Sequence, residues 1–404
     1  MMNAKFLFLI GAGLLLSFGY ILTLVPNNDH TQLFDRAVLF YQQGKLLSYG
    51  VHAGGSLGVV PGPLIGILSA LPYWLYPHPY SPMIFILLLH IASYFLIHRV
   101  LQNFLSEKSL LIYCAMFWLL PWRASEVVLW NISYLFFFSA VHLYTGYRCS
   151  QKKSFLFTFL HVINLGFVFQ IHYSAMILLL ASLYFVFKRK VHIHWPAVIT
   201  GFLLVCASLI PFILDYYHQQ LPYQLGSAPE KENRYFMRGL ITVFPVLKSL
   251  LYWIRFASLY TSRSIIQYTD LSWLHESLTL YWKWFALFLG VLTTGISAYL
   301  NFLFFKAAKK ENHFLKSYLV SLILAMLIAT GISPMTSTHW HVLIIFHAAL
   351  LPVAIQLPQQ QLYLKYKKAI HISFISFCVL INLLAIMKSE NHHFLSHSTE
   401  FKSE

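Results

Sequence analysis

The sequence contains few charged residues and very few acidic ones. Only 13 of its 404 residues are Asp or Glu, against 28 Lys or Arg, and charged residues make up 10% of the chain. An ordinary soluble domain carries about 25% charged residues, so this composition excludes one. Because 58% of the residues are hydrophobic and 17% are aromatic, the composition predicts a polytopic membrane protein.

Cysteine is also scarce, and its spacing indicates no metal site. Cys114, Cys149, Cys206 and Cys378 are scattered through apolar text without a CxxC pair. We interpret all four as small core residues. The sequence also lacks internal repeats, low-complexity tracts and a soluble domain, so residues 1–404 are expected to form a single transmembrane domain.

Apolar runs predict about eleven transmembrane helices and therefore an all-α polytopic fold. A spanning helix needs roughly 20 apolar residues, and several of these runs are shorter than that. The first run has no small-residue cleavage site, so it is predicted to be a retained signal anchor. The predicted spans are residues 6–25, 82–100, 109–127, 131–147, 155–169, 173–187, 196–214, 280–305, 317–332, 342–357 and 369–387.

The excess of basic residues follows the positive-inside rule and does not indicate a nucleic-acid partner. With the amino terminus inside, every predicted cytoplasmic connection carries at least two Lys or Arg. The outer side then receives most acidic residues, so acidic chemistry is expected on the outer face of the cytoplasmic membrane. The cytoplasmic connections are residues 99–108, "YRCSQKKS", "FKRKVHIH", "KAAKKENHFLK" and "YLKYKK".

Two predicted outer connections are long, at residues 26–81 and 215–279. In the first, residues 64–76 are apolar, bracketed by prolines and too short to span, which predicts a helix lying in the membrane interface. In the second, residues 240–260 are apolar but interrupted by Pro245, Lys248 and Arg255. This pattern also predicts an interfacial helix.

Asp29 is the first candidate for chemistry, because it follows the first span within "VPNNDHTQLFDRA". A carboxylate there stays ionised and reaches a group held at the interface. The alternative is that Asp29 caps a helix beginning at His30, since Asp is a preferred N-cap. Asp35, followed by Arg36, would lie on another helix face and is interpreted as a solvated charge.

Two further patterns in the outer loops suggest substrate contacts. In "VVPGPLIG", Pro61 and Pro63 flank a glycine and predict a rigid turn, whose alternative role is a plain loop-to-helix junction. Arg234 and Arg238 stand at i and i+4, a spacing that places two guanidinium groups on one helix face. Such a pair clamps a phosphate; the alternative is that both snorkel to lipid headgroups.

Histidines near the predicted outer face give only a weak indication of a metal. His339 and His341 are two residues apart and point away from each other on a helix, so we interpret them as interfacial. His30 and His172 also fall on the outer side, where they could help a carboxylate to hold a divalent cation. Because the chain has 20 histidines, the motif predicts no defined metal site and leaves the cofactor unknown.

The order of these features resembles the GT-C superfamily of polyprenyl-phosphate-dependent glycosyltransferases. The likeness rests on the first helix, "NDH", "QGKLL" and "PGPLIGILSALPYWLY", followed by "LSEKSLLIYCAMFWLLPWRASEVVLWNISYLFFFSAV" and "QIHYSAMILLLASLYFVFKRKVHIHWPAVITGFLLVCASLIPFILDYY". These segments are similar to those of the aminoarabinose transferase, protein O-mannosyltransferase and bacterial oligosaccharyltransferase group. The match is one of layout and covers roughly the first 220 residues.

The resemblance implies that Asp29 matches the first-loop aspartate that helps to activate the acceptor. His30 stands where many relatives have a second acidic residue. The second outer loop of the family often has an acidic motif, and here Glu126 in "SEVVLWN" is the only carboxylate near it and is not in register. Both departures put a metal site in doubt. The donor would be a polyprenyl-phosphate-linked sugar held among membrane lipids, and the acceptor a lipid, glycan or protein. Cations for the leaving phosphate would be Arg234 and Arg238 first, then Arg123, Arg255 and Arg263.

Two other functions remain open on the sequence. A lipid or glycan transporter or flippase should show ionisable residues in mid-helix or broken helices repeated in two halves, and neither is clear in the sequence. An O-antigen ligase or polymerase would be favoured by a late outer loop rich in arginine. The late outer loop "ISPMTSTHWH" has none.

Overall fold

The structure, a computed structural model, describes residues 3–23, 28–52, 58–218, 221, 243–260, 275–307, 313–333 and 338–388. Helix α1 (Ala4–Leu22) opens the chain, and the side chain of Asn3 caps it by accepting from the backbone of Lys5 and Phe6. The predicted all-α polytopic class is confirmed. Seven helices of the described residues are long and apolar enough to cross a membrane, and the number eleven stays a prediction.

The first long connection folds into two helices and a small hairpin. The hairpin pairs two short antiparallel strands, which the glycine-rich sequence did not reveal. Arg36 ties helix to hairpin, because its guanidinium donates to the carbonyl oxygens of Tyr49 and Gly50 and lies 5.0 Å from the Tyr49 ring. The elements are α2 (Asn28–Gln43), β1 (Tyr49–His52), β2 (Val59–Pro61) and α3 (Leu64–Leu75), and α2 packs along α3.

The rest of the chain forms a bundle in which each predicted span falls on helical segments. The second predicted interfacial helix, near residues 240–260, is α11; that it and α3 lie in the interface stays a prediction. The bundle elements are α4 (Ser81–Leu101), α5 (Glu107–Leu119), α6 (Pro121–Ala124), η2 (Asn131–Tyr134), α7 (Leu135–Gln151), α8 (Phe155–Phe169), α9 (Ala175–Phe187), α10 (Trp195–Tyr217), α11 (Val243–Phe256), α13 (Glu276–Ala307), α14 (His313–Ile332), α15 (His339–Val342), η4 (Leu343–Ile345), α16 (Phe346–Ala349), α17 (Leu351–Gln356), η5 (Leu357–Gln359) and α18 (Gln361–Lys388).

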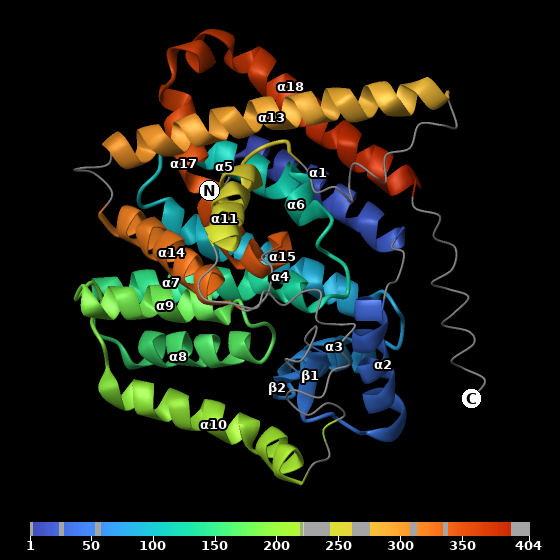
Figure 1. Cartoon of the computed structure of the whole chain (residues 1–404), viewed down its shortest axis with the longest axis vertical. Helices are drawn as coiled ribbons and strands as arrows, with labels where there is room; N and C mark the ends of the chain where they lie inside the picture. The colour runs from blue at the N-terminus through green and yellow to red at the C-terminus, as the bar shows by residue number, and fades with distance from the viewer. Residues whose placement is uncertain are drawn as a thin grey trace.

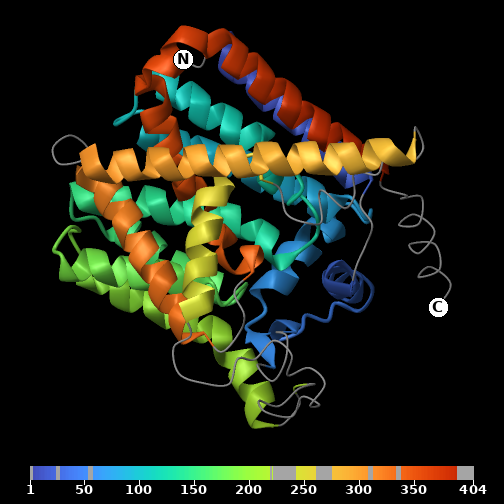
Figure 2. The ribbon, with the colours of Figure 1, turned by 45° about the horizontal axis from the view of Figure 1, so that its top comes forward.

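Packing places one broken span at the centre of the bundle. The segment His339–Gln359 is 83% buried, whereas α10 at the edge is 11% buried. Pro352 and Pro358 each start a new helical piece, as expected because proline cannot donate a backbone hydrogen bond inside a helix. Around this core α4 packs on α7, α8 lies between α7 and α10, and α9 packs on α14 (Figure 1); α13 crosses over the bundle (Figure 2).

The two ends of the bundle differ. At one end, which we call the first-loop end, the hairpin reaches the α8–α9 turn, where the Tyr173 hydroxyl donates to the Val59 carbonyl oxygen at 3.3 Å (Figure 1). At the opposite end, the Phe6 ring of α1 lies 5.7 Å from the His98 ring of α4. By the charge rule, the first-loop end is the predicted outer face.

A hydrogen-bonded polar chain crosses four helices within the bundle. His142 binds the Tyr318 hydroxyl through Nδ1 at 3.0 Å and Ser182 Oγ through Nε2 at 2.9 Å. His161 binds the same Ser182 Oγ through Nε2 at 2.9 Å and Thr145 Oγ1 through Nδ1 at 2.8 Å. The expectation that the sequence shows no clear mid-helix ionisable residues is therefore corrected, because an isolated histidine in an apolar run gives no sign of its partners.

The hydrogens of this polar chain can be assigned without leaving a member unpaired. Ser182 Oγ lies 2.8 Å from the Leu178 carbonyl and can donate there while accepting from Nε2 of both imidazoles. The hydroxyls of Tyr318 and Thr145 then donate to the two Nδ1 atoms. A fully satisfied polar network of this kind joins helices rather than destabilising them.

We predict that Ser182→Ala destabilises the bundle by about 1–3 kcal/mol, because it leaves two imidazole nitrogens without a partner. Thermal unfolding of the purified protein in detergent measures the effect as a lower midpoint. Ser139→Ala is the matched control, since Ser139 is 2% exposed but donates only to the local Phe136 carbonyl. Equal midpoints for the two variants would contradict a joining role for the network.

Candidate functional site

Aromatic and imidazole rings gather where the first loop meets the bundle. The His30 ring of α2 lies edge-on to Trp130 at 6.3 Å, and Trp130 lies 5.9 Å from Trp340 of α15. His172, between α8 and α9, lies 5.9 Å from His341, also on α15. Together with His339, these residues form what we call the histidine–tryptophan cluster: His30, Trp130, His172, His339, Trp340 and His341.

Helix α11 adds two cations to this cluster. It packs on α15, and its Tyr252 ring lies 6.1 Å from the His339 ring. Lys248 and Arg255, one on each side of Tyr252 in the sequence, both act electrostatically on His339. Arg255 lies 3.7 Å from the centre of the Tyr260 ring, which orients its guanidinium by cation–π attraction.

Hydrogen bonds fix the tautomers of two cluster histidines. Nδ1 of His172 accepts from the backbone N–H of Ser174 at 3.1 Å, and Nδ1 of His341 accepts from that of Thr338 at 3.0 Å. A neutral imidazole that accepts at Nδ1 carries its proton on Nε2. Both histidines therefore offer an Nε2–H donor, which suits an anion and not a metal ion, because a metal ion would need the Nε2 lone pair.

The electrostatics of His172 keep it neutral. Burial, and to a lesser extent the neighbouring His341, lowers its pKa to about 3. His172 is therefore a neutral donor at every pH at which the protein would work. Among the described residues, no group of three His, Cys, Asp or Glu is arranged to hold a metal ion.

The Pro-Gly-Pro turn braces the first loop against the α8–α9 turn. Pro61 ends β2, Pro63 precedes α3, and Gly62 between them has a φ of +89°. The side chain of Gln170 lies so close that a Cβ at Gly62 would be 2.3 Å from its Oε1. The turn thus packs against Gln170, which precedes His172 by two residues, and acts as a positioning element. Its geometry gives no direct substrate contact.

Asp29 lies in the first turn of α2, whose described backbone already includes Asn28. It is therefore part of the helix instead of preceding it, although its side chain lies outside the described part. A negative charge in the first helical turn is favoured by the helix dipole. The neighbouring His30 is 6% exposed and packs toward the cluster, while Asp35 is exposed as expected.

Arg123 uses much of its guanidinium group on backbone carbonyls. Its side chain is fully buried; Nε donates to the Phe117 carbonyl at 2.9 Å, and Nη2 donates to the Trp118 carbonyl at 2.8 Å. These carbonyls end α5 and have no helical partner, so Arg123 stabilises that helix end. These bonds give Arg123 a structural role at the end of α5, but its buried Nη1 has no hydrogen-bond partner among the described residues, so the predicted phosphate contact stays a prediction.

Glu126 is buried close to this helix end. Its side chain is 7% exposed, and its Oε2 atom has no hydrogen-bond partner among the described residues. The carboxyl of Glu126 is not part of the histidine–tryptophan cluster as we define it. The interpretation that it is out of register with the family's acidic motif stays a prediction.

Other predicted site residues lie outside the described part, namely Arg234, Arg238 and Arg263. The structure instead brings forward Lys248, Trp130 and Trp340, which the sequence pattern did not single out for binding. Lys248 had been interpreted only as an interruption of an apolar helix. Lys248 and Arg255 are seven residues apart, which is about two helical turns. This spacing was the signal in the sequence that could have placed the two cations on one face of α11.

Comparison with known proteins identifies the fold. No family model and no curated protein matches the sequence. Two crystal structures of ArnT from Cupriavidus metallidurans do match. The apo form superposes with a TM-score of 0.58 and 10% sequence identity. The form bound to undecaprenyl phosphate superposes with a TM-score of 0.57 and 8% sequence identity. The chain has the fold of ArnT. The GT-C resemblance predicted from the order of segments is thereby confirmed for the fold.

The match to ArnT is unequal in extent. It covers 92% of this chain but 63% of the ArnT chain, so this chain spans less than two thirds of the length of ArnT. The predicted resemblance covered roughly the first 220 residues, whereas the ArnT-like fold extends over nearly the whole chain. Helices beyond residue 220 are therefore part of the shared architecture.

We predict that Gly62→Ala lowers the thermal unfolding midpoint by several degrees. A side chain there must adopt a left-handed φ and displace Gln170, whose Nε2 donates to Ser208 Oγ at 2.8 Å, at a cost of about 1–3 kcal/mol. Gly11→Ala in α1 is the control, because nothing lies within 4 Å of the added Cβ. A Gly62→Ala midpoint at or above that of the control would refute the bracing role.

Proposed function

We propose that the protein is an inverting membrane glycosyltransferase, acting on the outer face of the cytoplasmic membrane. Its donor is a polyprenyl-phosphate-linked sugar, and its acceptor is a lipid, glycan or protein. The observation that carries the proposal is the ArnT fold over 92% of the chain, because one matching ArnT structure is bound to undecaprenyl phosphate. The sugar, the acceptor and the length of the lipid carrier are left open.

In the proposed reaction Asp29 is the general base. Its carboxylate takes the proton of the acceptor hydroxyl, and the oxygen attacks the anomeric carbon of the donor. The bond from that carbon to the phosphate oxygen breaks on the opposite face of the sugar, and its electron pair leaves with polyprenyl phosphate. Attack from the face opposite the leaving group inverts the anomeric configuration.

The leaving phosphate gains negative charge as this bond breaks, so a preorganised cation lowers the barrier. We assign that role to Arg255 and Lys248 on α11, with the Nε2–H groups of His172 and His341 as neutral donors. This set revises the sequence-based order, in which Arg255 stood in reserve. Its support is the shared position of two cations and two donors around one cluster.

The transporter alternative draws on two features that the structure reveals. The span His339–Gln359 is broken, and His142 and His161 lie in mid-helix. Broken helices and intramembrane ionisable groups are common in transporters. We favour the transferase, because His142 and His161 have hydrogen-bond partners on both nitrogens and the fold is that of ArnT.

We predict that Asp29→Asn reduces sugar transfer by about 100-fold to 10,000-fold while the protein still inserts, because the amide cannot accept the proton. The measurement compares lipid-linked sugars and surface glycans, by mass spectrometry, in a deletion strain carrying either form. Asp35→Asn on the same helix is the matched control and should keep wild-type transfer. Full transfer by Asp29→Asn would rule out the base.

We predict that Arg255→Gln slows transfer by about 100-fold, because one cation facing the leaving phosphate is lost, and that Lys248→Gln has an effect in the same direction. Single-turnover rates at saturating polyprenyl-phosphate sugar separate this loss from weaker donor binding. Arg148→Gln is the control, since Arg148 lies 4.5 Å from the Phe157 ring in the last turn of α7. Unchanged rates in both α11 variants would remove these cations from the mechanism.

A further inference from the structure

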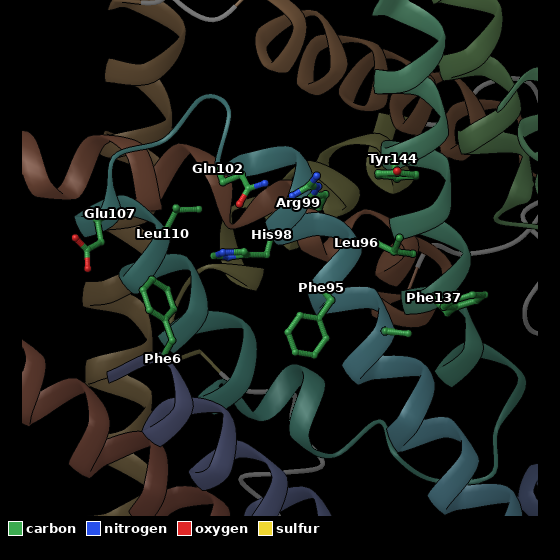
Figure 3. A pocket seen from close by; sticks show the side chains of 11 residues that line it. Phe6, Phe95, Leu96, His98, Arg99, Gln102, Glu107, Leu110, Phe137 and Tyr144 are labelled. Carbon is green, nitrogen blue, oxygen red and sulfur yellow. The ribbon is translucent and has the colours of Figure 1, made fainter. Parts of the chain in front are cut away.

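A groove of about 850 Å³ opens where α4 ends and α5 begins, with Arg99, Gln102 and Glu107 among its lining residues (Figure 3). Side chains of α1, α4, α5 and α7 line it. Its wall is apolar, with Phe95 and Leu96 of α4 and Phe137 and Tyr144 of α7 among the residues that form it. Phe95 is 47% exposed, so the wall is open toward the surroundings of the bundle.

The rim of the groove carries both signs of charge. Arg99 and Gln102, both exposed, stand at the last turn of α4, and Glu107 stands at the start of α5 (Figure 3). Within the described residues, the guanidinium of Arg99 has no ion pair or hydrogen bond. Asn3 donates to Oε1 of Glu107, and Oε2 has no partner in the described chain. The rim therefore presents a cationic donor group and a carboxylate oxygen that are both available to a ligand.

We propose that this groove binds a zwitterionic glycerophospholipid with a primary ammonium, of the phosphatidylethanolamine class. Arg99, with Gln102, receives the phosphate, and the free oxygen of Glu107 receives the ammonium. One acyl chain lies against Phe95, Leu96 and Phe137. A headgroup with negative charge and no ammonium, such as that of phosphatidylglycerol, fits this rim less well, because Glu107 would repel it.

Physical chemistry places the selectivity of this site in the rim. An acyl chain that leaves the bilayer for an apolar groove gains little, because lipid tails are as apolar as the side chains that replace them. The headgroup contacts are made at the membrane surface, where a cation attracts an anionic group. The site should therefore discriminate between headgroups several-fold and hardly at all between acyl chains.

This lipid site is separate from the proposed glycosyl-transfer site. The groove is lined by the second half of α4, from Ala92 onward, and the first loop joins the opposite end of this helix, which has 21 residues and is about 30 Å long. The proposal does not depend on the proposed function. A bound phospholipid here would be a resident partner of the fold and not the sugar donor.

The test measures which lipids the full-length protein retains. Purified protein is delipidated in detergent, exposed to equal amounts of phosphatidylethanolamine, phosphatidylglycerol and phosphatidylcholine with identical acyl chains, and examined by native mass spectrometry. The wild type should retain phosphatidylethanolamine several-fold over both others. Phosphatidylcholine shares the phosphate but lacks an N–H donor for Glu107, so it isolates that contact.

Two variants separate the two charges. Arg99→Gln should lower retention of phosphatidylethanolamine and phosphatidylglycerol together, whereas Glu107→Gln should abolish the preference between them and keep binding. Arg148→Gln, a cation at the same end but outside the groove, should match the wild type. Equal retention of the three lipids by the wild type, or an unchanged preference in Glu107→Gln, would overturn the proposal. Since a loss of preference with binding retained cannot come from misfolding, the Glu107 variant remains decisive if Arg99→Gln is unstable.

Discussion

A polar group inside an apolar bundle must find a partner or carry a cost of several kcal/mol, and this constraint sorts the polar residues of the chain by role. Arg36 and Arg123 use their guanidinium groups on backbone carbonyls that the hairpin and α5 leave unpaired. His142 and His161 use both ring nitrogens on neighbouring helices. Such groups hold the fold together, and of these only Arg123 keeps a buried nitrogen, Nη1, without a hydrogen-bond partner among the described residues.

The same constraint singles out the groups whose bonding capacity is not exhausted. His172 and His341 accept at Nδ1 from their own turns and keep an Nε2–H to offer. Arg255 rests on an aromatic ring, and its buried Nε lacks a hydrogen-bond partner among the described residues. These groups gather at the first-loop end, in the same cluster as His30. Asp29 is the residue that precedes His30 in the chain. Buried atoms without a hydrogen-bond partner also occur elsewhere in the described bundle, among them both ring nitrogens of His347 and Nη1 of Arg123. What distinguishes the cluster is that its donors and cations gather around one set of rings.

Sequence alone predicted the helices well, because long apolar runs have few alternatives in a membrane. The β1–β2 hairpin was missed, since a glycine-rich passage carries no periodicity and its strands are held by Arg36 from another element. Candidate residues were harder to place. Arg123 is a cation near the predicted outer face, and only the positions of the Phe117 and Trp118 carbonyls show that it is already engaged. The partners of His142 lie up to 176 residues away, so spacing could not predict them.

The packing of α11 adds what composition alone does not give. Lys248 and Arg255 interrupt an apolar run, and a run with cations is ordinarily interpreted as a helix lying at the surface. In the structure α11 packs on α14, α13 and α15, and Tyr252, Trp253 and Phe256 are buried. A cation on a helix packed in this way carries a desolvation cost that a surface lysine or arginine does not. Arg255 carries such a cost, which the faces of Tyr252 and Tyr260 offset in part, and an anion beside it, as the proposed mechanism requires, would offset it further.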